Sequence, residues 1–101
     1  MLKKLEDKNI ENLVKAFVAL DDEAFCYNFL EDLCTVPEVK AMAQRLAVAK
    51  MLDEHKAYND IAAATGASTA TISRVNRSLT YGADGYRCML DKLGDELKNE
   101  Q

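Results

Sequence analysis

The sequence predicts an all-α fold, a small helical bundle in a single domain that spans residues 1–101. Hydrophobic residues make up 49% of the chain, which has only four glycines and one proline. The chain therefore has enough apolar surface to fold and few residues that break helices. Apolar residues recur at intervals of three and four, the spacing of one face of a helix. A chain of this length buries one modest core, which argues against a second independent module.

Residues 1–34 are predicted to form two amphipathic helices. The first covers about three turns before Asp21 and Asp22 end it. The second is expected from Asp22 to Leu33, with acidic residues near its N-terminus, where the helix dipole favours them. The apolar stripes comprise Ile10, Leu13, Val14, Phe17, Val18 and Leu20 in the first helix, and Ala24, Phe25, Phe29, Leu30 and Leu33 in the second.

Residues 35–56 are predicted to form a central helix, which begins at Val36 and ends near Glu54. Thr35 and Glu38 have the spacing of a capping box, and Pro37 suits the first turn because a backbone N–H is not needed there. The buried stripe of this helix is expected to comprise Val39, Met42, Leu46, Ala49 and Leu52.

Residues 58–79 are rich in small side chains and predict two short helices, 59–65 and 69–79, that meet at Gly66. Glycine permits the left-handed backbone that ends a helix, and Ser68 can cap the next one. The residues at inward positions are Ile61, Thr65, Ala67, Ile72 and Val75, and Ala62 lies where the two helices would cross closely. This combination predicts a helix-turn-helix, although a helix pair without a nucleic-acid role could share it.

A last helix is predicted over residues 84–98. Its apolar stripe comprises Tyr86, Met89, Leu90, Leu93 and Leu97. Gly94 is the weak point of this helix, because glycine is a poor helix former.

The distribution of charge predicts one surface that accepts an anion. The net charge of −4 argues against an indiscriminate polyanion binder, and residues 5–32 alone carry −6. Residues 61–83, by contrast, contain no acid and two arginines, Arg74 and Arg77. Short polar side chains on the second helix of the motif would let it lie deep in the major groove of double-stranded DNA. The candidate DNA-binding residues are Ser68, Thr69, Ala70, Thr71, Ser73 and Arg77.

The sequence carries no sign of an enzyme, a cofactor, a metal site or a membrane span. Cys26, Cys34 and Cys88 lack metal-ligand spacing and cannot all pair within one chain, so structural thiols are expected. His55 lies among charged residues without a nucleophile nearby. The longest uncharged run is too short and too polar to cross a bilayer, and acids near Met1 exclude a secretory signal. We expect a cytoplasmic protein.

The segment from Thr35 to Leu90 resembles the Trp repressor family, and specifically its shorter Trp-repressor-like branch of the YerC/YecD kind. The sequence from Thr35 to Glu38, followed by Arg45, resembles the start of that family's central helix. The sequence from Ala70 to Leu79 resembles its recognition helix. The resemblance implies a transcriptional regulator that forms an intertwined homodimer through its N-terminal helices and binds a palindromic operator.

The resemblance also implies an effector pocket made by Thr35, Arg45, Arg74 and Ser78. Tryptophan-binding members have a glycine after the second arginine, which leaves room for the indole, whereas this chain has Val75. We therefore expect a repressor that acts without tryptophan and leaves Arg74 free to contact phosphate. Two alternatives stay open, namely a repressor with an unknown small-molecule effector and a protein-interaction module built on a helix-turn-helix scaffold.

Overall fold

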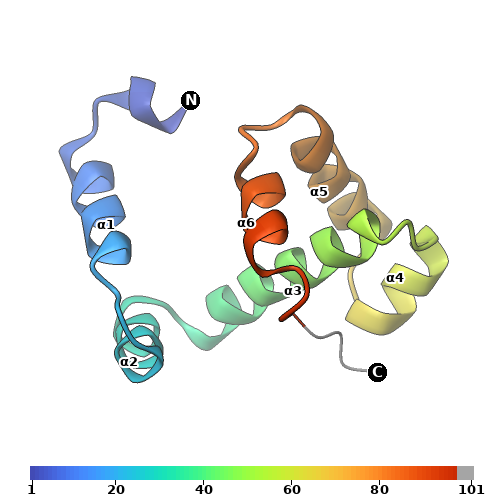
Figure 1. Ribbon diagram of the computed structural model, residues 1–101, viewed down its shortest axis with the longest axis horizontal. Coiled ribbons are helices and arrows are strands. Elements are labelled where there is room, and N and C mark those ends of the chain that lie inside the picture. The colour runs from blue at the N-terminus through green and yellow to red at the C-terminus, as the bar shows by residue number, and fades with distance from the viewer. Residues whose placement is uncertain (98–101) are drawn as a thin grey trace. The chain divides into compact units, whose positions relative to one another are not determined.

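The computed structural model describes residues 1–97, which form helices and connecting turns without a β-strand (Figure 1). The helical elements of these residues are η1 (Leu2–Leu5), α1 (Lys8–Val18), α2 (Glu23–Leu33), α3 (Val36–Asp53), α4 (Tyr58–Thr65), α5 (Thr69–Tyr81) and α6 (Gly85–Leu93). The all-α prediction is thus confirmed. The chain divides into two compact units, an N-terminal unit, Met1–Val36, and a C-terminal unit from Pro37 onward.

Aspartate side chains cap the N-termini of both α-helices of the N-terminal unit. The Asp7 carboxylate accepts a hydrogen bond from the backbone N–H of Ile10 at 3.3 Å, and Asp22 accepts one from Phe25 at 2.8 Å. Such caps satisfy backbone donors that the helix itself leaves free. Periodicity identified the apolar stripe of α1 but not its cap at Asp7, and the helix ends at Val18, slightly before the predicted end at Asp21.

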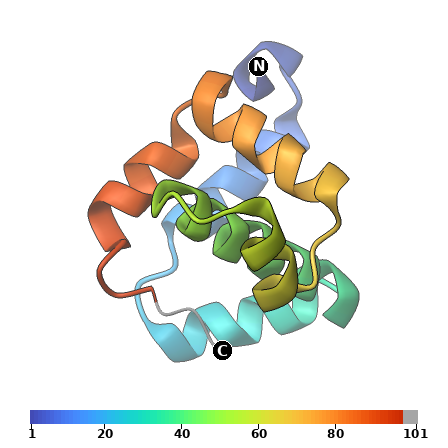
Figure 2. The same ribbon diagram turned by 90° about the vertical axis from the view of Figure 1, so that its right-hand side faces the viewer.

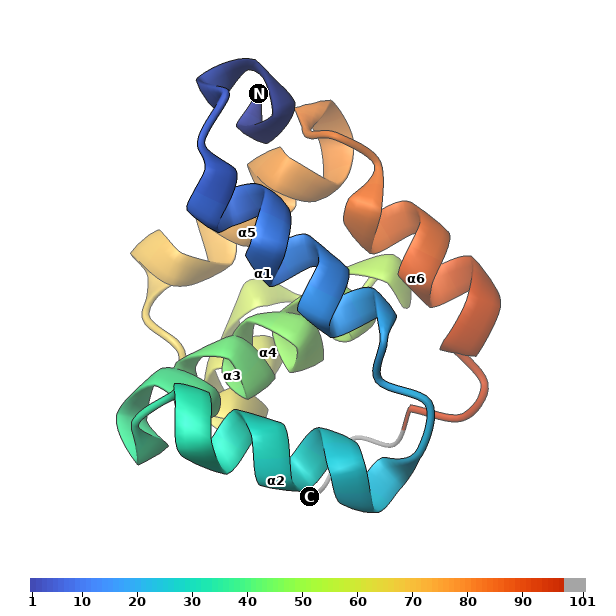
Figure 3. The same cartoon turned by 90° about the vertical axis from the view of Figure 1, so that its left-hand side faces the viewer.

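The apolar stripes of the N-terminal unit remain largely exposed. Helices α1 and α2 run in different directions (Figure 3), and Phe17 meets Phe29 edge to face with the ring centroids 5.8 Å apart. Neither helix contains a buried residue, and Val14 and Phe25 are 53% and 45% exposed. This unit therefore has amphipathic helices but no closed core of its own.

The core lies in the C-terminal unit, where α4, α5 and α6 pack with α3 (Figures 1 and 2). Its buried residues are Val48, Ala49 and Met51 on α3, Ile61 on α4, Ala67 in the turn, Ile72 and Val75 on α5, and Leu90 on α6. One continuous cluster thus joins all four helices, as expected for a small domain.

The prediction for the buried stripe of α3 was only partly right. Ala49 is buried, but Met42 is 37% exposed, and Val39, Leu46 and Leu52 are half-buried. The fully buried residues of α3 lie between Val48 and Met51. Periodicity identifies the apolar face of a helix, but partner helices decide which part of that face is covered.

Helix α6 is shorter than predicted. It ends at Leu93, and Gly94 follows as its C-cap, whereas the expected helix continued to residue 98. Residues 94–96 form turns, and position 98 lies outside the described residues. The glycine noted as a weak point therefore coincides with the end of the helix.

Candidate nucleic-acid interface

The α4–α5 segment has the geometry of a helix-turn-helix. Gly66 adopts the left-handed conformation, with φ 75°, at the C-cap of α4. The Ser68 hydroxyl accepts a hydrogen bond from the backbone N–H of Thr71 at 3.1 Å and begins α5. Ile61, Ala67 and Val75 are buried between the helices and α3. The turn and the caps therefore agree with the sequence prediction.

A small hydrogen-bond network holds the turn in place. The Thr65 hydroxyl donates to the carbonyl of Ile61 at 2.7 Å and accepts from the backbone N–H of Ala67 at 3.1 Å. The side-chain amide of Gln44, on α3, donates to the carbonyl of Thr65 at 3.0 Å. Gln44 thus ties the turn to α3. The sequence analysis missed this contact because its partners are 21 positions apart and share no local pattern.

The sequence-predicted contact residues gather on the solvent side of α5. Ser68, Thr69, Ala70, Ser73 and Arg77 are exposed, while Thr71 is half-buried. Ile72 and Val75 face inward with at most 2% exposure. The first two turns of α5 therefore present short polar and apolar side chains, which allow close approach to another surface.

This face of α5 is also free of negative charge. Residues 61–83 contain no acid, and Arg74 and Arg77 are exposed. Neither arginine forms an ion pair within residues 1–97. Both guanidinium groups are therefore available to an external anion.

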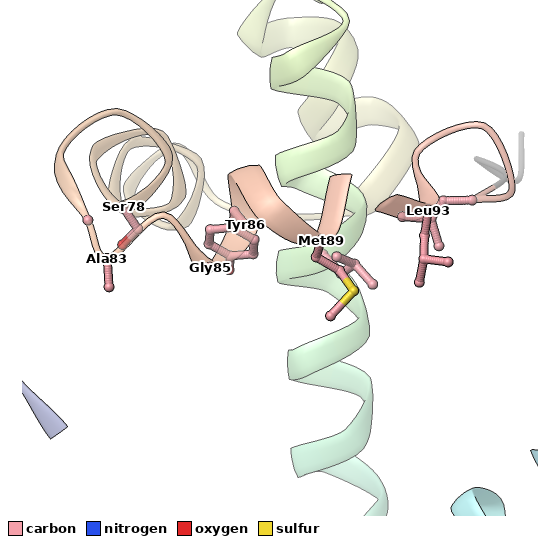
Figure 4. A pocket seen from close by; sticks show the side chains of 9 residues that line it. Ser78, Ala83, Gly85, Tyr86, Met89 and Leu93 are labelled. Atoms are coloured by element: carbon pink, nitrogen blue, oxygen red, sulfur yellow. The ribbon is translucent and has the colours of Figure 1, made fainter. Parts of the chain in front are cut away.

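Of the four residues that the resemblance assigns to an effector pocket, only Ser78 lines a hollow found in the C-terminal unit. An open hollow of about 560 Å³ is lined by Leu46, Ser78, Gly82, Ala83, Gly85, Tyr86, Met89, Leu93 and Leu97 (Figure 4). Ser78 belongs to this mostly apolar lining, whereas Arg45 and Arg74 do not. Arg45 is half-buried on α3, and Thr35 is in the N-terminal unit.

One ion pair joins α6 to α3 outside the helix-turn-helix, and a second lies within α6. Arg87 donates to the Asp53 carboxylate at 2.8 Å, and Asp91 lies 3.6 Å from the same guanidinium. The hydrogen bond to Asp53 raises the pKa of Arg87 above its ordinary value. Its charge is thus held at the α3–α6 junction, away from the exposed face of α5.

Other chemistry is sparse in residues 1–97. No group of three or more His, Cys, Asp or Glu in that range could hold a metal ion. The three cysteines are free, and Cys88 is exposed, although buried structural thiols were expected. No helix in the described range is long and apolar enough to span a membrane.

The geometry of α4 and α5 defines a helix-turn-helix protein. The profile of the Trp repressor protein family matches residues 8–94, and the chain belongs to this family. Its members are transcription regulators and not enzymes.

Individual relatives agree with this assignment. The chain is 49% identical to the uncharacterized protein YerC of Bacillus subtilis (strain 168) over 90 residues, which cover 89% of this chain and 86% of that protein. A crystal structure of a TrpR-like protein from Eubacterium eligens ATCC 27750 matches 91% of this chain and 95% of its own, with a TM-score of 0.86 and 53% identity. A candidate Trp repressor from Staphylococcus aureus covers 97% of this chain and 98% of its own, with a TM-score of 0.87 and 43% identity.

Proposed function

We propose that this protein is a sequence-specific DNA-binding transcriptional regulator that reads its operator with α5 and acts as a homodimer. The observation that carries the proposal is the exposed, acid-free face of α5, presented by a capped helix-turn-helix. In proteins with this motif, the N-terminal residues of the second helix contact base edges in the major groove.

The side chains of α5 divide into two roles. Thr69 and Ala70, in the first turn, contact bases, because a short hydroxyl and a methyl group fit against base edges and the thymine methyl. Ser68 and Thr71 lie at or near the helix N-terminus, which suits phosphate oxygens, and Ser73 lies on the outward face. Arg77 contacts the DNA backbone and positions the helix without reading sequence.

The N-terminal helices hold the dimer together. Support comes from the N-terminal unit, which carries apolar stripes but no buried residue. A second chain would cover these stripes and form the core that one chain lacks. A symmetric dimer then binds a palindromic operator with half-sites about 34 Å apart.

Tryptophan is not the corepressor. Val75 is 2% exposed and belongs to the same core as Ile61 and Ile72, so its side chain fills the position at which tryptophan-binding members have glycine. Arg74 is exposed and contacts phosphate in place of an effector. The alternative of an unknown effector keeps Thr35, Arg45, Arg74 and Ser78 as its pocket.

The test is a selection of duplexes from a random DNA library by the purified protein, with and without tryptophan. We expect one palindrome to be enriched equally in both arms. Enrichment only with tryptophan would contradict the assignment of Val75. No enrichment in either arm would favour the two alternatives, a repressor that needs another effector or the protein-interaction module. The Lys92→Ala variant removes an exposed charge from α6 and serves as a control that should select the same palindrome.

A further inference from the structure

Tyr81 is an exposed aromatic residue at the end of α5. The sequence predicted that this helix ends at residue 79, but it continues to Tyr81. The Tyr81 side chain is 83% exposed and forms no hydrogen bond within residues 1–97. A large ring that leaves both its face and its hydroxyl in solvent contributes nothing to the core described above.

Tyr81 lies on the same face of α5 as the proposed DNA contacts. Ala70, Arg74, Arg77 and Tyr81 are spaced by four, three and four residues, so they form one stripe along the helix. Ile72 and Val75, which are buried, lie on the opposite side. We call these four residues the outward strip. It begins with a methyl group, continues with two arginines and ends with a phenol.

The length of the outward strip indicates what its far end meets. At about 1.5 Å per residue, Tyr81 lies about 16 Å along the helix axis from Ala70. The major groove is about 12 Å wide. A helix that enters the groove by its N-terminus and places Ala70 against the bases therefore carries Tyr81 past the base edges, toward the sugar-phosphate backbone.

We infer that Tyr81 is a DNA-backbone contact whose phenol hydroxyl donates a hydrogen bond to a phosphate oxygen flanking the bases read by α5. Tyrosine hydroxyls are established donors to DNA phosphates, and such contacts fix orientation without reading sequence. The absence of acids from residues 61–83 removes the repulsion that would oppose this approach. The inference rests on the proposed function and extends its footprint from the third turn of α5, which carries Arg77, to the fourth turn.

The experiment compares wild type with Tyr81→Phe, which removes only the hydroxyl. Tyr27→Phe is the matched control, because Tyr27 is 68% exposed, lies outside α5, and is not part of the apolar stripe of α2 that a second chain would cover. Binding is measured by fluorescence anisotropy to the selected operator and to an unrelated duplex, and unfolding is followed by thermal melting. We expect Tyr81→Phe to weaken both complexes by the same factor, about three- to tenfold, with an unchanged melting temperature. Tyr27→Phe should bind like wild type.

A modified operator identifies the group that Tyr81 contacts. Replacing single flanking phosphates by neutral methylphosphonates should reveal one position that weakens wild type but not Tyr81→Phe. Equal binding by wild type and Tyr81→Phe would overturn the inference while leaving the proposed function intact. A changed sequence preference in Tyr81→Phe would overturn the backbone assignment, and a shift in its oligomeric state by sedimentation would assign Tyr81 to self-association. A wild-type protein that binds no duplex would refute the proposed function and this inference together.

Discussion

Replacing Val75 by glycine tests both the packing of the core and the exclusion of tryptophan. Val75 is 2% exposed, and Val75→Gly removes three buried carbons, which are worth about 0.8 kcal/mol each. A glycine in a helix interior adds a cost of about 1 kcal/mol. The free energy of unfolding should therefore fall by roughly 3 to 4 kcal/mol, as measured by urea denaturation.

The space that Val75→Gly opens should admit an indole ring. We expect Val75→Gly to bind tryptophan in titration calorimetry and wild type not to bind it. At a free tryptophan concentration of 100 times its Kd, binding to the folded state should restore about 2.7 kcal/mol of the lost stability. Ile61→Ala is the matched control, because it also removes three carbons from the same core and should gain no response to tryptophan.

Three outcomes would refute this reasoning. Unchanged stability in Val75→Gly would mean that Val75 does not pack as described. A wild-type protein stabilised by tryptophan as strongly as Val75→Gly would mean that valine leaves room for the ligand. A destabilised Val75→Gly without a tryptophan response would show that Val75 is not what excludes the indole.

Three further predictions concern the α4–α5 motif. Arg77→Ala should weaken binding to every duplex alike, whereas Thr69→Arg should change or abolish sequence preference; if Arg77→Ala relaxed a single operator position in a repeated selection, the two roles would be misassigned. Gln44→Met removes the donor to the Thr65 carbonyl and should lower the free energy of unfolding by about 1 kcal/mol in urea denaturation. An unchanged free energy of unfolding would show that this hydrogen bond does not stabilise the turn. The dependence of log K on log salt should be no steeper than about −8 for a dimer, because few phosphates are neutralised, and a steeper slope in anisotropy titrations would reveal basic contacts outside α5.

The helix-turn-helix could be predicted from the sequence because its determinants are local. Gly66 marks a backbone conformation that only a few residues adopt readily, and Ser68 lies where a cap must lie. The inward spacing of Ile72 and Val75 follows from the helix period. Each of these determinants depends only on positions a few residues apart in the sequence, so no knowledge of the tertiary structure was needed.

The missed features depend on contacts between segments that are distant in the sequence. Met51 is buried and Met42 is not, because other helices cover the part of α3 that contains Met51. Gln44 reaches the turn across 21 positions. Apolar periodicity also did not predict that α5 continues to Tyr81, since its apolar stripe stops at Leu79. These are effects of packing, which periodicity alone does not specify.

Contacts of α3 stabilise the position of α5 from both of its ends. Gln44 fixes the turn before α5, and the Arg87–Asp53 pair fixes α6, which packs on α5, to the end of α3. The side chains of the core fill the space between these two ties. In the proposed complex, helix α5 is already ordered before it meets DNA, so association loses little backbone entropy in the motif. The temperature dependence of binding should then reflect surface burial and ion release rather than coupled folding.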